Sequence, residues 1–181
     1  MSKSTKWLAV LVILGITLAG YTLAMRKFGS GTLPEMAAVS EQVDAVFVDK
    51  SERVLQLRRN GEVIRSYPID LGARPEGHKK QEGDERTPTG NYEIDWRNAN
   101  SGYHLSLHIS YPNEADVLAA KNRGVSPGGF VMIHGSPNGW SILSGLLQGQ
   151  DWTNGCLAVT NEVIREIWSL VPNGTPIEIV E

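Results

Sequence analysis

An uninterrupted apolar stretch near the N-terminus constrains the fold of this chain more than any other feature. From Trp7 to Met25 every residue is apolar or small, apart from two threonines and one tyrosine. A helix rises about 1.5 Å per residue, so this stretch is long enough to cross a hydrocarbon core about 30 Å thick. A membrane-spanning or signal helix is therefore expected here in preference to a buried core helix, and the globular part of the protein follows it.

The residues that flank this stretch bear on whether it is removed. Lys3 and Lys6 precede it, and Arg26 and Lys27 follow it directly. A basic pair in that position, with only the weak cleavage candidate 22–24 and no Ala-x-Ala motif, is unusual for a secretory signal. We expect residues 1–27 to be a retained signal anchor, with a cleaved signal as the alternative. With either a retained anchor or a cleaved signal, the rest of the chain is expected to be exported.

The remaining residues divide into a short linker and one domain. We expect a linker over residues 28–42, flexible around Gly29, Ser30 and Gly31, and a domain with a single core over residues 43–181. The formal net charge is −3, and charges of both signs are mixed without a basic stripe. Nucleic acid is therefore not an expected partner.

Short β-branched runs predict that the domain is rich in strands. Asn60-Gly61 is the strongest hairpin signal, between expected strands at 53–59 and 62–71. The other expected strands cover 43–49, 91–96, 103–110, 130–134, 157–160 and 176–180.

Two helices are expected among these strands. Asn113 is predicted to cap the first, which runs to about Asn122, and Asn161 to cap the second. The apolar face of the second contains Val163, Ile164, Ile167, Trp168 and Val171. We therefore expect a mainly β fold (β-rich α+β), closer to a sandwich or open barrel with packed helices than to an alternating α/β sheet.

Cys156 is the only cysteine of the chain. In an oxidising compartment cysteines are usually paired, so an unpaired thiol is either a buried bystander or a reactive group. The preceding Asn154-Gly155 predicts a turn, and His134-Gly135 ends an expected buried strand. A thiol with an imidazole as its base is a nucleophile suited to acyl transfer.

These residues resemble the signature of a known family. His134-Gly135, a loop and then Thr153-x-Gly155-Cys156 are similar to the motif of the L,D-transpeptidase catalytic domain (YkuD family). Residues 83–94 resemble the family's Thr-Pro-x-Gly segment, and residues 105–113 resemble a strand of its YafK-like branch. The resemblance spans about residues 43–181 and implies an L,D-transpeptidase-type β-sandwich.

The resemblance also implies a reaction. Cys156 would attack the carbonyl between the third residue, a diamino acid, and the D-alanine of a peptidoglycan stem peptide. A thioester would form, and an amine from a second stem peptide or a wall-linked protein would resolve it. His134 would be the base, with its second nitrogen held by a backbone carbonyl. The Gly155 and Cys156 amides would face the oxyanion, Asn154 and Gly135 would position the site, and Thr153 would contact substrate.

The other histidines are expected to be structural. His104 and His108 should share one face of the expected strand 103–110, and His78 should be a solvated loop residue beside the turn residue Asp84. The histidines lack the spacing of a zinc site, and no second cysteine exists. Neither a metal nor another cofactor is expected.

Two departures from the family pattern leave the reaction outcome open. Most members carry histidine where this chain has Asn154, and arginine where it has Ala158. An arginine there would offer a bidentate clamp for a substrate carboxylate. Hydrolysis by a peptidase or amidase is therefore the alternative to acyl transfer, and a non-catalytic wall-binding module is the second alternative. The expected partners are stem peptides, wall-linked proteins and the membrane, with the domain on the periplasmic side of the bacterial cytoplasmic membrane.

Overall fold

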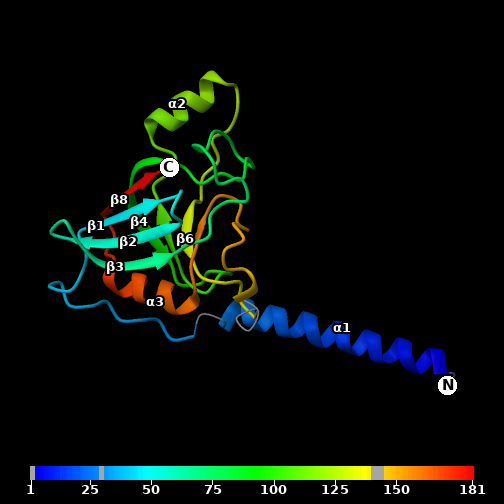
Figure 1. The fold of residues 1–181 in the computed structure, drawn as a ribbon. Helices are drawn as coiled ribbons and strands as arrows, with labels where there is room; N and C mark the ends of the chain where they lie inside the picture. The colour runs from blue at the N-terminus through cyan, green and yellow to red at the C-terminus, as the bar shows by residue number, and fades with distance from the viewer. Residues whose placement is uncertain (1–2, 29–30, 140–144) are drawn as a thin grey trace.

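A long N-terminal helix projects away from a curled β domain (Figure 1). The computed structural model describes residues 3–28, 31–139 and 145–181. Helix α1 spans Lys3–Phe28, and its segment Ser4–Met25 has a mean hydropathy of 2.2 and no buried residues. By length and composition this helix is able to cross a membrane. A signal sequence near the N-terminus has the same length and composition, so these two properties do not distinguish an anchor from a signal. Gly29 and Ser30 of the expected linker lie outside the described residues.

One curled sheet of eight strands forms the described part of the domain. Its order is β3-β2-β1-β8-β4-β5-β6-β7, with β1–β8 and β6–β7 parallel and the other neighbours antiparallel. The strands are β1 (Ala45–Asp49), β2 (Val54–Arg59), β3 (Glu62–Pro68), β4 (Gly90–Asn98), β5 (Ser106–Ile109), β6 (Met132–His134), β7 (Leu157–Ala158) and β8 (Thr175–Val180). The prediction of a β-rich α+β domain with packed helices is confirmed.

The two edges of the sheet meet through the segment that follows β3. Asp70 forms an antiparallel bridge with Ala158, and Gly72 forms a parallel bridge with Thr153. The amide of Asp70 donates to the carbonyl of Ala158 at 2.9 Å, and the reverse bond measures 2.8 Å. This contact curls the sheet and brings the segment after β3 against the cysteine loop.

The β2–β3 hairpin has the geometry that its turn residues predict. Asn60 has a φ of 53° and Gly61 a φ of 81°, as a type I′ turn requires, and the strands pair up to Arg59 and Glu62. Leu55 and Leu57 alternate inward from β2 and are fully buried. They belong to a core that also contains Ile177 and Ile179 of β8 and the inner face of α3.

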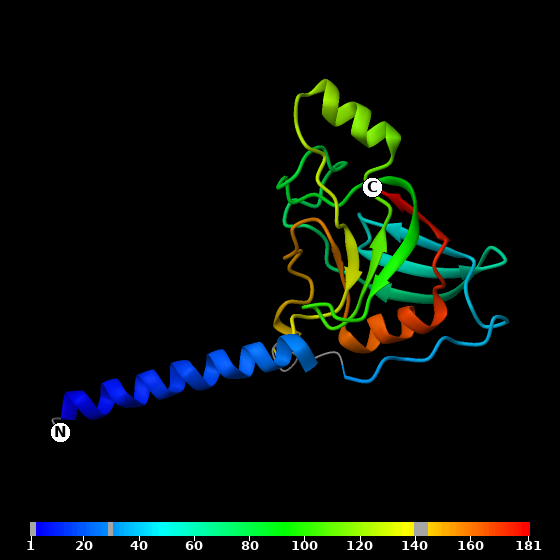
Figure 2. The same cartoon turned by 180° about the vertical axis from the view of Figure 1, so that it is seen from behind.

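Two further helices flank the sheet, and in both views they lie at opposite ends of it (Figures 1 and 2). Helix α2 (Glu114–Asn122) begins at the expected cap, because Asn113 and Asp116 form a reciprocal capping box. Helix α3 (Asn161–Leu170) buries the expected face through Ile164, Ile167 and Trp168.

The cap of α3 corrects one expectation. Thr160, not Asn161, is the N-cap, because its Oγ1 accepts a hydrogen bond from the Val163 amide at 3.2 Å. The side chain of Asn161 instead accepts from the Ser136 amide at 2.9 Å. Asn161 thereby ties the start of α3 to the segment that follows His134.

The strand expected over residues 103–110 is shorter than predicted. Only β5 is extended, and His104 precedes it with a φ of 66°. The chain turns there because the Asn138 side chain accepts from the His104 amide at 2.8 Å, while the Gly135 amide donates to the carbonyls of Tyr103 and Leu105. His104 therefore does not share a strand face with His108, contrary to the expectation.

Candidate active site

The loop that carries Cys156 is held by the hydroxyl of Thr153. Its Oγ1 accepts from the Gly155 amide at 3.1 Å and donates to the Cys156 carbonyl at 2.7 Å. The Thr153 side chain is buried, so these bonds form away from bulk solvent. The loop is a closed turn that presents the cysteine at the start of β7.

Gly155 is required at its position for two reasons. Its φ of 118° lies in the region that favours glycine, and a Cβ placed there would lie 2.5 Å from the carbonyl oxygen of Arg86. The backbone at Arg86 therefore packs directly against the turn that carries Cys156.

These contacts refine the roles expected from the sequence. The Gly155 amide is engaged with Thr153, so it does not point freely at an oxyanion as expected. The oxyanion role that remains as a prediction belongs to the Cys156 amide. Thr153 lines the pocket, but its hydroxyl is hydrogen-bonded to the backbone of the cysteine turn.

His134 ends β6 and reaches the site as a neutral imidazole. Its Nδ1 lies 2.7 Å from the carbonyl oxygen of Gly135, the kind of backbone partner that was expected. A carbonyl only accepts, so Nδ1 carries the proton and Nε2 carries the lone pair. Burial lowers the pKa of His134 to about 4, and the hydrogen bond to Gly135 opposes this shift in part. At neutral pH Nε2 is therefore a base.

Two aromatic rings enclose this imidazole. The ring of Tyr103 lies 4.6 Å from that of His134, and the ring of Trp152 meets it edge to face at 5.6 Å. Neither residue was predicted to belong to the site. The position of Trp152 immediately before the Thr153 turn was the available signal, but it did not show which way the indole would point.

Cys156 and His134 line the same pocket, which has a volume of about 340 Å³. Asn154 also lines it and is exposed, whereas Gly135 is not among the lining residues. A Cβ on Gly135 would lie 2.6 Å from Asn161 Oδ1, so the chain passes too close to α3 there for a side chain. The remaining lining residues are Ser101, Tyr103, Ser106, Phe130, Met132, Trp152 and Thr153.

The thiol of Cys156 is protonated in this resting arrangement. Its Sγ donates to the Phe130 carbonyl at 3.7 Å. Burial raises the pKa of Cys156, and a backbone hydrogen bond from Met132 and the charge of Lys79 offset part of that rise. The site thus holds a neutral thiol and a neutral imidazole, so a thiolate would form here only if the thiol proton were transferred to a base.

Lys79 is a buried cation that sequence reasoning missed. Its ammonium donates to Asp84 Oδ1 at 2.8 Å and to the Gln81 carbonyl at 3.1 Å. Asp84 also accepts from the backbone amides of Lys80, Gln81 and Arg86, so it is the turn residue that was expected.

The remaining histidines have structural partners. His78 is not the solvated loop residue expected, because its Nε2 lies 3.0 Å from Asp116 Oδ1 and the Thr89 amide donates to its Nδ1. His108 contacts Asp95 at 2.6 Å and stacks on Trp96. Among the described residues, no group of three or more histidine, cysteine, aspartate or glutamate side chains is arranged to hold a metal ion.

Comparison with known families identifies the domain. Residues 44–179 match the YkuD family, described as the L,D-transpeptidase catalytic domain. The chain belongs to this family. Among curated relatives, the Escherichia coli K12 protein named "Putative L,D-transpeptidase YafK" is 30% identical over 94% of this chain. The alignment covers 64% of that longer protein.

Two solved structures of other bacterial proteins share the fold. The helical cell shape determining protein Pgp2 from Campylobacter jejuni is 24% identical, with a TM-score of 0.59 over 88% of this chain and 55% of its own. Bd1075 from Bdellovibrio bacteriovorus is 24% identical, with a TM-score of 0.54 over 83% of this chain and 52% of its own. The chain thus spans about half the length of these proteins.

Proposed function

We propose that this domain is a cysteine acyltransferase that acts on peptidoglycan stem peptides. The observation that carries the proposal is that Cys156 and His134 line one pocket, with the Nε2 lone pair of His134 left for the thiol proton. Membership of the L,D-transpeptidase family supports the choice of substrate.

The proposed reaction proceeds in two halves. His134 Nε2 takes the thiol proton, and Cys156 Sγ bonds to the carbonyl carbon of the third residue of the stem peptide. The carbon–nitrogen bond to D-alanine breaks, and the imidazolium returns the proton to the leaving amine. An acceptor amine then attacks the thioester, gives a proton to His134, and restores the thiol.

The Cys156 amide has the electrostatic role in this proposal. Negative charge develops on the carbonyl oxygen in both tetrahedral intermediates, and a donor fixed in place stabilises that charge. The closed turn around Thr153 holds the backbone at Cys156 before substrate arrives. Asn154, which is exposed at the pocket, would contact the peptide.

Hydrolysis is the second candidate, favoured by a specific observation. Ala158 stands where most family members carry an arginine, so no cation from this position clamps a substrate carboxylate. Water would then resolve the thioester and release the trimmed peptide.

We also propose that the domain works at the cell envelope. Helix α1 is exposed along its apolar length and would hold the domain at the outer face of the cytoplasmic membrane. Wall-linked proteins would be acceptors or substrates within reach of such an anchored domain.

The test is a product analysis with the full chain in detergent micelles. Disaccharide tetrapeptides are incubated with the protein, with and without an amine acceptor, and the products are weighed by mass spectrometry. We expect loss of D-alanine together with a cross-linked product, and no turnover by Cys156→Ser, because a serine hydroxyl is far less acidic than a thiol.

Each outcome of that analysis assigns a function. Loss of D-alanine without a cross-link would select the hydrolase. Binding without turnover would select the wall-binding module. Full activity in a folded Cys156→Ser variant would reject Cys156 as the nucleophile.

A further inference from the structure

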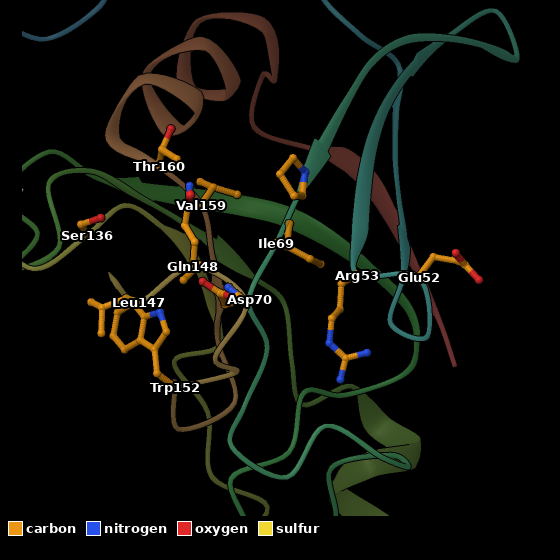
Figure 3. Close-up of a pocket in the computed structure, with 13 residues that line it drawn as sticks. Glu52, Arg53, Ile69, Asp70, Ser136, Leu147, Gln148, Trp152, Val159 and Thr160 are labelled. Atoms are coloured by element: carbon orange, nitrogen blue, oxygen red, sulfur yellow. The ribbon is translucent and has the colours of Figure 1, made fainter. Parts of the chain in front are cut away.

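A second pocket, of about 230 Å³, lies next to the catalytic one and shares Trp152 with it. Figure 3 shows Asp70, Leu147, Gln148 and Trp152 grouped at this pocket. Its apolar walls are formed by Pro68, Ile69, Leu147, Trp152, Ala158 and Val159.

A row of three residues across the sheet links the two pockets. His134 of β6 is the register partner of Ala158 of β7, and Ala158 is bridged in turn to Asp70. Laterally paired residues point to the same face of a sheet. His134 lines the catalytic pocket, whereas Asp70 lines the second one. The short side chain of Ala158 stands between them and leaves the space beside Asp70 open.

Asp70 is a buried carboxylate in the wall of this pocket, only 6% exposed. The Gly149 amide donates to its Oδ1 at 2.5 Å, and the Trp152 indole and the Gln150 amide face the same group. Burial raises the pKa of Asp70, the hydrogen bonds from Gly149, Trp152 and Gln150 oppose the rise in part, and the neighbouring charge of Asp151 adds to it. A cation placed here would relieve both effects.

The arginine that lines this pocket is already engaged. Arg53 donates from Nε and Nη2 to Asp151 Oδ2, at 3.0 and 2.7 Å. In Figure 3 the Arg53 guanidinium points away from Asp70. Glu52 adds a further carboxylate at the pocket. Arg53 is thus neutralised by Asp151, and none of the ion pairs found among the described residues includes Asp70, so the buried carboxylate would attract positive charge to this pocket.

We propose that this second pocket binds a primary ammonium group on a short apolar stem, with Asp70 as its counter-ion. The apolar walls suit the methylene stem, and the buried carboxylate suits the charged end. The inference rests on the proposed function for one point only, namely that the amine belongs to a molecule that reacts at Cys156. In the row across the sheet, Ala158 is the only residue between Asp70 and His134. A ligand bound at Asp70 could therefore extend past Ala158 toward the catalytic pocket.

Binding is tested directly by nuclear magnetic resonance with n-butylammonium as the probe. The readout is the indole N–H signal of Trp152, assigned by its loss in Trp152→Phe. We expect a saturable shift with n-butylammonium and at least a tenfold weaker affinity for n-butanol, which has a similar shape and no charge. Equal affinities for the two probes would overturn the proposal.

Two variants and a matched control locate the charge. Asp70→Asn should remove the preference for the ammonium, whereas Glu62→Gln, which removes an exposed carboxylate on β3, should retain it. Loss of the preference in both would show a general charge effect and reject the site.

Asp70 also holds the Gly149 loop, so a second variant keeps that carboxylate in place. Ala158→Arg would put a guanidinium beside Asp70 and should abolish the n-butylammonium shift without lowering the unfolding midpoint. An unchanged shift in this folded variant would reject the pocket as the binding site.

The proposed function can fail separately from this inference. Cys156→Ser should bind n-butylammonium as the native chain does, because the thiol does not line this pocket. If the native chain binds n-butylammonium but shows no acyl transfer, the ammonium site is supported and the proposed reaction is rejected. If acyl transfer occurs but n-butylammonium does not bind, only the ammonium site is rejected.

Discussion

The imidazole of His134 donates from Nδ1 to the carbonyl oxygen of Gly135 across 2.7 Å, and this bond selects the tautomer. With Nδ1 protonated, Nε2 is the only ring atom able to take a proton at neutral pH. Tyr103 and Trp152 pack against the ring and keep water away from it. The proposed base is thus oriented by the backbone, with the Gly135 carbonyl as its partner at Nδ1.

Replacement of His134 by alanine should remove most activity at pH 7. General base assistance is typically worth about 10²- to 10⁴-fold, and we expect a loss in that range. Raising the pH should restore part of the activity, because hydroxide can generate the thiolate without the imidazole. The measurement is the rate of D-alanine release between pH 7 and pH 10.

His108→Ala is the matched control for that variant. His108 lies outside the catalytic pocket, where it contacts Asp95 and stacks on Trp96, so its loss should change the rate only a few-fold. Reaction of the His134→Ala thiol with iodoacetamide at the native rate at pH 7 would show that the two residues are not paired.

The buried neutral state of His134 should make stability depend on pH. Its folded pKa of about 4 lies below the ordinary value of 6.5, so the unfolded chain binds the proton more readily. The stability linked to this group is complete above pH 6.5 and is lost as the pH falls toward 4, by about 3 kcal/mol in all. Urea unfolding at pH 7, 5.5 and 4.5 measures this loss.

A variant without the imidazole isolates that contribution. His134→Gln should flatten the dependence between pH 6.5 and 4. The carboxyls of Asp84 and Glu181 have lowered pKa values, so their contributions also begin to be lost at the acid end of this range. Both groups are present in the variant as well, so their effect cancels in the comparison. An equal slope in the native and variant chains would contradict a buried neutral imidazole.

Gly155→Ala should destabilise the domain more than the same change at another glycine of positive φ. The added Cβ would strain the backbone and also meet the Arg86 carbonyl at 2.5 Å, so we expect a loss of about 2 kcal/mol or more. Gly61→Ala carries only the backbone strain, since nothing lies within 4 Å of its Cβ, and should cost about 1 kcal/mol.

The difference between these two variants reports the contact behind the cysteine turn. Thermal and urea unfolding give both values, and D-alanine release tests whether Gly155→Ala also displaces Cys156. If Gly155→Ala and Gly61→Ala lower the free energy of unfolding equally, the close approach of the Arg86 carbonyl does not contribute to the effect at Gly155.

The N-terminal helix should remain on the mature protein. If residues 1–27 are a retained anchor, the chain isolated from cells begins at or near Met1 and fractionates with membranes, because a basic pair follows the apolar span directly. N-terminal sequencing of the membrane and soluble fractions measures this. A mature terminus near Met25 in a soluble exported fraction would identify a cleaved signal and would leave the enzyme assignment unchanged.

Local sequence patterns determined the elements of this protein. The type I′ turn at Asn60-Gly61, the Asn113 cap and the buried face of α3 each depend on residues within a few positions of one another. The Cys156 and His134 motifs were recognisable for the same reason, because each is a short run of residues. The resemblance that these motifs carry was sufficient to identify the family.

Tertiary structure decided how these elements meet. The bridge from Asp70 to Ala158, the contact of His78 with Asp116 and the burial of Lys79 against Asp84 depend on a chain path that the residues at those positions do not specify. The same path placed His104 in a turn, where its amide donates to the side chain of Asn138. Spacing along the chain predicts which residues share an element, whereas burial and partners are set by the packing of elements that are distant in sequence, and these in turn set the pKa values of His134 and Cys156.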